Sequence, residues 1–160
     1  MKKIAFCLMF AVSGAAVASD TWFEVSGVSK HLQKSTYTWK GETKKFNETN
    51  IGLGLAKEVH DNVELKVGFY ENSYNKTSKY AAGFVHANMT YGDFKVKPGV
   101  VAGVVTGYDE TPELANKVQP IAYAVIAVEY KSVRVNVGYL PSRLVGGNTD
   151  VATIQFGFKF

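Results

Sequence analysis

The chain has 160 residues, of which 46% are hydrophobic and 20% charged, and its formal net charge is +4. This length supports one domain and leaves too little chain for two. The small positive charge, without a basic stripe interleaved with aromatic residues, excludes nucleic acid as an expected partner.

A pattern typical of a cleaved secretory signal occupies residues 1–18. Two lysines precede an apolar run that begins at Ile4, and the segment ends in Ala16-Val17-Ala18. A membrane-anchoring helix is the alternative, but Ser13 and Gly14 interrupt the run, and it is shorter than the ~20 apolar residues that a span needs. We expect residues 19–160 to form the mature domain, without the chain's single cysteine, Cys7.

The mature region contains eight segments with strand character and no convincing amphipathic helix. The segments are roughly 22–31, 50–59, 62–71, 77–91, 94–106, 118–130, 132–141 and 150–160. The connections between them are alternately long and tight, and an even number of strands joined in this way is typical of bacterial outer-membrane barrels. We therefore predict an all-β fold, an eight-stranded antiparallel up-and-down transmembrane β-barrel in the bacterial outer membrane.

The composition of the strand faces separates this barrel from a secreted soluble one of the lipocalin type. A soluble barrel needs a polar outer face, whereas residues 100–105 and 121–126 are apolar on both faces. With one face toward lipid, the other is predicted to line an apolar lumen, which suits an acyl chain better than an ion. Tyrosines near the strand ends suggest an interfacial girdle: Tyr70, Tyr74, Tyr80, Tyr91, Tyr108, Tyr123, Tyr130 and Tyr139.

Three prolines fall within or at the ends of these segments, and each removes a hydrogen-bond donor from the barrel wall. An ordinary bulge or strand end explains Pro98. For Pro120 and Pro141 a lateral opening that admits lipid is a serious rival to that explanation.

Two residues at the outer rim have side chains suited to chemistry. Ser73 lies at the tip of the third segment and His31 ends the first. A hydroxyl group needs a nearby base to react, and imidazole is the usual base near neutral pH. On spacing alone the signal is weak, because a loop serine is usually a turn former and a rim histidine is usually just solvated. His60 and His86 do not have ligand-like spacing, and we expect neither a metal nor a cofactor.

Several motifs resemble, in order and approximate spacing, those of the lipid A palmitoyltransferase family, PagP, whose members are eight-stranded outer-membrane barrel enzymes. They are His31, Phe46-Asn47-Glu48, Gly52-Leu53-Gly54-Leu55, Asn72-Ser73-Tyr74-Asn75-Lys76, Pro120, Tyr139-Leu140-Pro141 and Gln155-Phe156-Gly157-Phe158-Lys159-Phe160. The likeness covers most of the mature chain, which is similar to a short, divergent member.

The resemblance implies transfer of a palmitoyl chain from a phospholipid donor to lipid A, with an apolar pocket in the barrel measuring the chain. The family's catalytic histidine and serine fall on His31 and Ser73, and its catalytic aspartate falls on Asn72. Asparagine can orient a neighbour but cannot carry charge. The family also has an amphipathic helix before the first strand, whereas the expected signal cleavage leaves only about three residues before Trp22.

Three hypotheses follow from the sequence. The first is a PagP-like barrel that binds lipid acyl chains and transfers palmitate, acting as a monomer, with His31, Ser73 and Asn72 as its site. The second is a non-catalytic outer-membrane barrel whose loops serve surface masking, exclusion or attachment. The third is a secreted lipid carrier.

Overall fold

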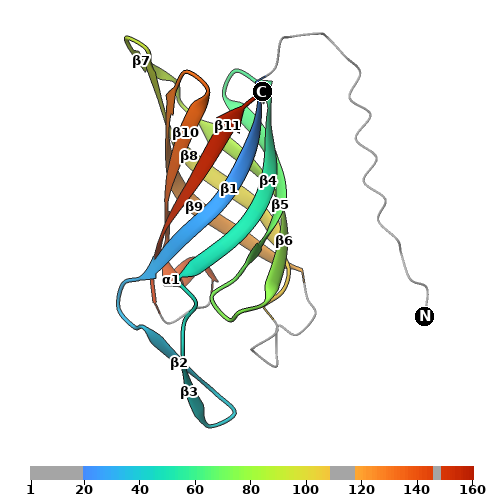
Figure 1. The fold of residues 1–160 in the computed structure, drawn as a ribbon, viewed down its shortest axis with the longest axis vertical. Coiled ribbons are helices and arrows are strands. Elements are labelled where there is room, and N and C mark those ends of the chain that lie inside the picture. Colours follow the sequence, from blue (N-terminus) through green and yellow to red (C-terminus); the bar gives the residue numbers. More distant parts are fainter. Residues whose placement is uncertain (1–19, 109–117, 146–148) are drawn as a thin grey trace, which may run out of the picture.

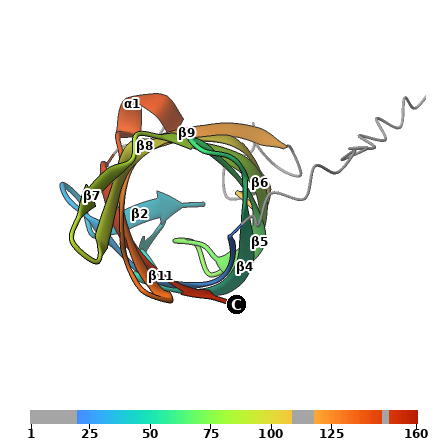
Figure 2. The same cartoon turned by 90° about the horizontal axis from the view of Figure 1, so that it is seen from above.

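The computed structural model describes residues 20–108, 118–145 and 149–160, so the predicted signal over residues 1–18 lies outside the described residues. Within the described part, eight long antiparallel strands close into a barrel (Figures 1 and 2). The strands are β1 (Thr21–His31), β4 (Thr49–His60), β5 (Val63–Glu71), β6 (Thr77–His86), β8 (Phe94–Val105), β9 (Gln119–Tyr130), β10 (Val133–Leu140) and β11 (Val151–Lys159). The predicted fold is confirmed.

The strands follow one another round the barrel in chain order, and the last one, β11, pairs with the first along its length, from Trp22 opposite Lys159 to His31 opposite Val151. A three-residue strand, β7 (Met89–Tyr91), continues the hairpin with β8 beyond the end of β6. The tight turns lie at the end that carries the C-terminus, and the long connections lie at the other end (Figure 1). We call the latter the outer end.

The sequence did not predict the hairpin in the first long connection. It is formed by β2 (Thr36–Trp39) and β3 (Glu42–Lys45) and extends beyond the barrel (Figure 1). Its turn residues, Lys40 and Gly41, have φ angles of 49° and 83°, the positive values that two-residue hairpin turns require. A single helical turn, α1 (Ser142–Val145), lies outside the ring of strands in Figure 2. No helix in the described residues is long and apolar enough to cross a bilayer.

The outward-facing side chains of the described strands form an exposed apolar surface. Exposed positions alternate with buried or half-buried ones along most of β4 and β5 and from Ile154 to Phe158 in β11, as a two-residue period requires. Prominent members of this surface are Ile51, Val67, Phe69, Val85, Val100, Ile126, Val137 and Phe156. This is the outer face of a barrel surrounded by lipid, and it lacks the polar character that a secreted lipid carrier needs.

The half of the lumen beside the tight turns is filled by buried charges, so the prediction of an apolar lumen is wrong there. The Arg134 guanidinium lies 2.7 Å from a Glu64 carboxylate oxygen and 2.6 Å from one of Glu129. Lys97 lies 3.1 Å from Glu64 and 3.0 Å from Glu129, and Lys66 lies 2.8 Å from Glu24. We call these six residues the ion network. The ion network could not be predicted from the sequence pattern, because each strand contributes only one or two of its members.

Candidate functional site

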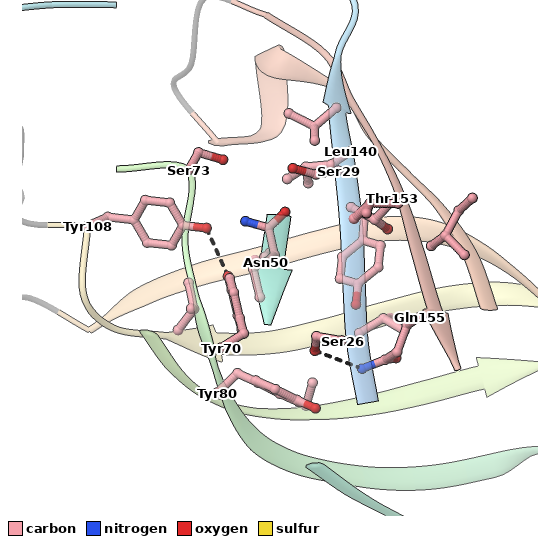
Figure 3. A pocket seen from close by; sticks show the side chains of 18 of the residues that line it. Ser26, Ser29, Asn50, Tyr70, Ser73, Tyr80, Tyr108, Leu140, Thr153 and Gln155 are labelled. Atoms are coloured by element: carbon pink, nitrogen blue, oxygen red, sulfur yellow. Dashed lines mark hydrogen bonds between the residues drawn. The ribbon is translucent and has the colours of Figure 1, made fainter. Parts of the chain in front are cut away.

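The outer half of the lumen holds a cavity of about 240 Å³ that opens toward the long connections (Figure 3). Its wall includes Ala82, Val101, Ile121 and Val151, and polar groups of Lys66 and Gln155 lie at its inner end. Five of the tyrosines predicted for an interfacial girdle line this cavity instead: Tyr70, Tyr74, Tyr80, Tyr108 and Tyr123. Tyr91, Tyr130 and Tyr139 are exposed, as the girdle prediction required.

A bulge in β1 turns His31 toward the cavity. The pairing of β1 with both of its neighbours shifts between Ser26 and Val28. Simple alternation from Ser26 would point Val28 and Lys30 inward, but the extra residue reverses the faces, so Val28 is exposed and His31 buried. The extra residue is Gly27, where a Cβ atom would come within 2.9 Å of the Ile154 carbonyl oxygen.

His31 is held between an aromatic ring and a carboxylate, and only 6% of it is exposed. Its ring stacks on Phe46, with 3.9 Å between centroids and 4° between planes. Glu48 Oε1 lies 3.7 Å from Nδ1 and also accepts a hydrogen bond from the His31 backbone N–H at 3.2 Å. Glu48 Oε2 pairs with Lys30 Nζ at 2.9 Å. The hydrogen bonds from Lys30 and the His31 backbone lower the pKa of Glu48, which keeps it ionised near neutral pH.

Ser73 lies in the β5–β6 turn and lines the same cavity as His31 (Figure 3). The chain after Phe46 ties this turn to the His31 side of the barrel, because the Asn47 N–H donates to the Ser73 carbonyl at 2.8 Å. The Asn47 side chain donates to the Asn72 carbonyl at 3.2 Å. The structure therefore brings His31 and Ser73 to one cavity mouth, although no hydrogen bond joins their side chains in the described part of the chain.

The side chain of Asn72 presents no free polar group to this cavity mouth. Its side chain is fully buried, and its Oδ1 accepts the N–H groups of Tyr74 and Lys76 at 2.9 and 3.1 Å. Its Nδ2 donates to Ser78 Oγ at 3.0 Å and to the Gly107 carbonyl at 2.6 Å. Both donors and both acceptor sites of the amide are thus used in shaping the turn that carries Ser73.

Deeper in the cavity, the aromatic residues interact in two ways. Tyr70 and Tyr108 share a hydrogen bond of 2.8 Å between their hydroxyl groups (Figure 3). Tyr80 lies against the wall, where a Cβ atom at Gly68 would come within 2.8 Å of its hydroxyl oxygen and one at Gly54 would clash with it. These two glycines thus make room for the Tyr80 ring along the β4–β5 wall.

The wall of the cavity is incomplete between β9 and β10. Pairing of β9 with β10 ends at Ala124 opposite Tyr139, whereas pairing of β9 with β8 continues to Gln119 opposite Val105. Residues 119–123 of β9 therefore have no β10 partner among the described residues, and they include Pro120, which has no N–H to satisfy. Pro141 directly follows β10, whereas Pro98 lies where β6 gives way to β7.

A second set of hydrogen bonds fastens the rim next to His31. The Asp150 carboxylate accepts from Tyr139 Oη at 2.7 Å, Gln33 Nε2 at 2.9 Å and the Ser142 N–H at 2.8 Å. These donors lower the pKa of Asp150 well below its usual range. We call this set the rim clasp; it joins the first and last long connections.

Sequence reasoning missed Glu48 and Phe46 as site residues, although both belong to a motif that the resemblance uses. Their roles depend on the fold of the β2–β3 connection, and strand alternation carries no signal for the course of a long connection. The inward tyrosines were also missed, although parity within the strands could have located Tyr70, Tyr80 and Tyr123.

Comparisons with known proteins agree with the barrel. The family model described as "Antimicrobial peptide resistance and lipid A acylation protein PagP" matches residues 14–156. No curated protein sequence matches the chain significantly.

The chain is also similar to solved structures of transmembrane barrels. A structure from the de novo design of transmembrane β-barrels has a TM-score of 0.61 and 18% identity, covering 88% of this chain and 95% of that chain. The solution NMR structure of the designed barrel TMB2.3 has a TM-score of 0.54 and 13% identity, with the same coverage of 88% and 95%. For the N-terminal β-barrel domain of OprF from Pseudomonas aeruginosa, the values are 0.47 and 14%, with 88% and 97% covered. The two designed barrels support the fold alone.

Proposed function

Because the chain belongs to the PagP family of lipid A acylation proteins and is a bacterial outer-membrane β-barrel, we propose that it binds a lipid acyl chain in its lumen and transfers palmitate from a phospholipid to lipid A. The family implies lipid substrates in the membrane. One observation carries the proposal: His31, at the end of β1, and Ser73, in the β5–β6 turn, line the mouth of one cavity inside the barrel. The proposal includes removal of residues 1–18 and function as a monomer.

The acyl chain enters from the side in this proposal. The stretch of β9 without a β10 partner, residues 119–123, lies at the level of the cavity, and Gln119, Pro120 and Ile121 line it. A chain that passes between β9 and β10 there reaches the cavity without crossing a continuous hydrogen-bonded wall. Lys66 and Gln155 limit its depth, because methylene groups gain nothing from contact with a buried charge.

Acyl transfer here requires a base at the cavity mouth. His31 removes the proton from a hydroxyl group of lipid A, the hydroxyl oxygen attacks the acyl carbonyl carbon, and the ester bond of the phospholipid breaks. The departing phospholipid oxygen then takes the proton from His31. Ser73 offers a hydroxyl at the same mouth that donates a hydrogen bond to the acyl carbonyl oxygen, and Asn72 fixes the turn that carries Ser73.

Expression of the gene in a strain that lacks its own lipid A palmitoyltransferase tests the proposal, with lipid A mass as the measurement. We expect a palmitate-sized increase. We expect His31→Ala to lower the transfer rate by roughly 10²- to 10⁴-fold, the usual contribution of a general base. His60→Ala and Ser132→Ala are matched controls for His31→Ala and Ser73→Ala, because they change the same side chains in tight-turn connections at the opposite end.

A non-catalytic barrel is the second candidate, favoured by asparagine at position 72 and by the complete use of its amide within the turn. It predicts unchanged lipid A mass from protein that is folded in the outer membrane. That result would refute the transferase proposal.

A further inference from the structure

The Glu48 carboxylate is the group best placed to pair with the imidazole of His31. Its Oε1 lies 3.7 Å from His31 Nδ1, and Nδ1 is buried without a hydrogen-bond partner among the described residues. The same oxygen accepts the His31 backbone N–H at 3.2 Å, so both contacts place it on the Nδ1 side of the residue. A side-chain shift of less than 1 Å by Glu48, which is 32% exposed, brings the carboxylate within hydrogen-bond reach of Nδ1.

The neighbours of Glu48 fix the geometry of this pair. Phe46 stacks on the imidazole of His31, with 3.9 Å between the ring centroids and 4° between the ring planes. Tilting the imidazole plane would lose that contact. Asn47 donates to the backbone carbonyls of both Asn72 and Ser73. Three consecutive residues thus fix the geometry of the site. Phe46 holds the plane of the imidazole, Asn47 holds the turn that carries Ser73, and Glu48 places its carboxylate near Nδ1.

We propose that Glu48 is the positioning residue for His31: its carboxylate holds the imidazole proton on Nδ1 and leaves the Nε2 lone pair directed away from the hairpin connection, toward the substrate. This inference rests on the proposed transferase function and assigns the acid of the site to position 48. Position 72 cannot supply it, because the Asn72 amide is used up by the turn and Gly107.

The carboxylate acts in both halves of the transfer reaction. When Nε2 takes the proton from the lipid A hydroxyl, the imidazole becomes a cation, and the negative charge of Glu48 stabilises it. The acyl ester then breaks, and the phospholipid oxygen recovers the proton from Nε2. Glu48 itself gains no proton at either step; the Nδ1 hydrogen stays on the ring throughout.

The tautomer of His31 provides a test that does not depend on activity. Nitrogen NMR of ¹⁵N-histidine protein in phospholipid nanodiscs distinguishes Nδ1–H from Nε2–H rings, and a His31→Gln sample assigns the signal among the three histidines. We expect the Nδ1–H form in the parent and a mixture of both forms in Glu48→Ala. An unchanged tautomer in folded Glu48→Ala would overturn the inference, whether or not the parent is active.

Kinetics provide the second readout. We expect Glu48→Ala and Glu48→Gln to lower kcat by roughly 10²-fold with KM almost unchanged, because the charge acts on the reacting imidazole. Glu48→Asp should restore part of the loss. If the parent transfers palmitate and Glu48→Gln keeps full kcat, Glu48 is not a positioning residue. If the parent is inactive but the tautomer responds to Glu48→Ala, the transferase proposal fails and the pairing stands.

Two control variants separate this role from a purely structural one. Glu42→Gln makes the same change in the same long connection, where the carboxylate pairs only with Lys44 at 3.5 Å among its described contacts. Lys30→Ala removes the other ion pair of Glu48 and leaves the contact with His31. Both should keep the tautomer and kcat of the parent. A loss of kcat in Lys30→Ala equal to that in Glu48→Gln would show that Glu48 acts only by fastening the loop.

Discussion

The polar residues in the two halves of the lumen have different roles. Beside the tight turns, the carboxylates of the ion network are each met by a cation within 3.1 Å, and Arg134 also lies over the Trp22 ring at 4.1 Å. In the outer half, the Nδ1 of His31 and the hydroxyl of Tyr80 have no hydrogen-bond partner among the described residues. Buried atoms without a hydrogen-bond partner occur beside the tight turns as well, at Glu24 Oε2 and Trp22 Nε1, so the difference lies in ion pairing and open space. Ion pairs hold the first half together, whereas the outer half contains the cavity, so stability and the proposed binding depend on separate ends of the same strands.

Removing Arg134, the central cation of the ion network, should have the largest effect of the four variants. That effect should be on stability alone. Arg134→Ala leaves Glu64 and Glu129 buried without their closest partner, which costs about 3–5 kcal/mol of unfolding free energy. Urea unfolding in phospholipid vesicles, followed by circular dichroism, measures it. Arg143→Ala, at an exposed arginine in α1, should change the free energy of unfolding by less than about 0.5 kcal/mol. A loss below about 1 kcal/mol in Arg134→Ala would mean that the ion network does not stabilise this half.

Asn72→Asp should show that the rim turn is also structural. The second carboxylate oxygen would face the Gly107 carbonyl, which now accepts from Nδ2 at 2.6 Å, so we expect a loss of about 1–3 kcal/mol. We expect no gain in palmitate transfer, because this side chain serves the turn. Increased transfer from Asn72→Asp, measured by lipid A mass, would return the acid of the site to position 72.

Filling the cavity should alter binding and spare stability. Ala82→Leu projects from β6 into the cavity, and at about 0.8 kcal/mol per buried methylene a chain that loses two methylene contacts binds roughly tenfold less tightly. Competition between fatty acids of different length for the protein in nanodiscs measures the preference, which should move to shorter chains. Ala81→Leu faces outward from the same strand and should leave it unchanged. Equal effects of both variants would show that the cavity is not the binding site.

Low pH should weaken the rim clasp, and this should be the smallest of the four effects. The pKa of Asp150 is lowered in the folded protein, so its contribution to stability is present above the unfolded value of 3.8 and is lost as the pH falls through the folded value. The protection of the Ser142 amide hydrogen, which donates to Asp150, should therefore fall at the acid end when its exchange rate is compared with the intrinsic rate at the same pH. In Asp150→Ala this amide should exchange quickly at every pH; protection that persists there would remove Asp150 from the clasp.

The strands were predictable because alternation and turn residues are local signals. The eight predicted segments agree with the long strands, except that the fourth, 77–91, divides into β6 and β7. The outward faces of Ile154, Phe156 and Phe158 follow directly from the two-residue period. The contents of the lumen were not predictable in the same way. Glu64 and Arg134 are far apart in sequence, and each resembles an isolated charge until barrel closure brings them together.

The site shows the same limit on a smaller scale. His31 and Ser73 were identified through a family resemblance, whereas the inward orientation of His31 depends on the one-residue bulge at Gly27. Strict alternation would have pointed Lys30 inward in its place. Glu48 depends on the path of a long connection, which no periodicity describes.

The seam between β1 and β11 joins the first and last strands of the barrel, and His31 pairs there with Val151. The strand that carries the proposed base therefore gains its second neighbour only when β11 is in place. A nascent or partly inserted chain has no enclosed cavity and no mouth at which His31 could act. Under the proposed function, closure of the barrel and completion of the site are one event, so transfer begins only in the membrane that holds the lipid substrates.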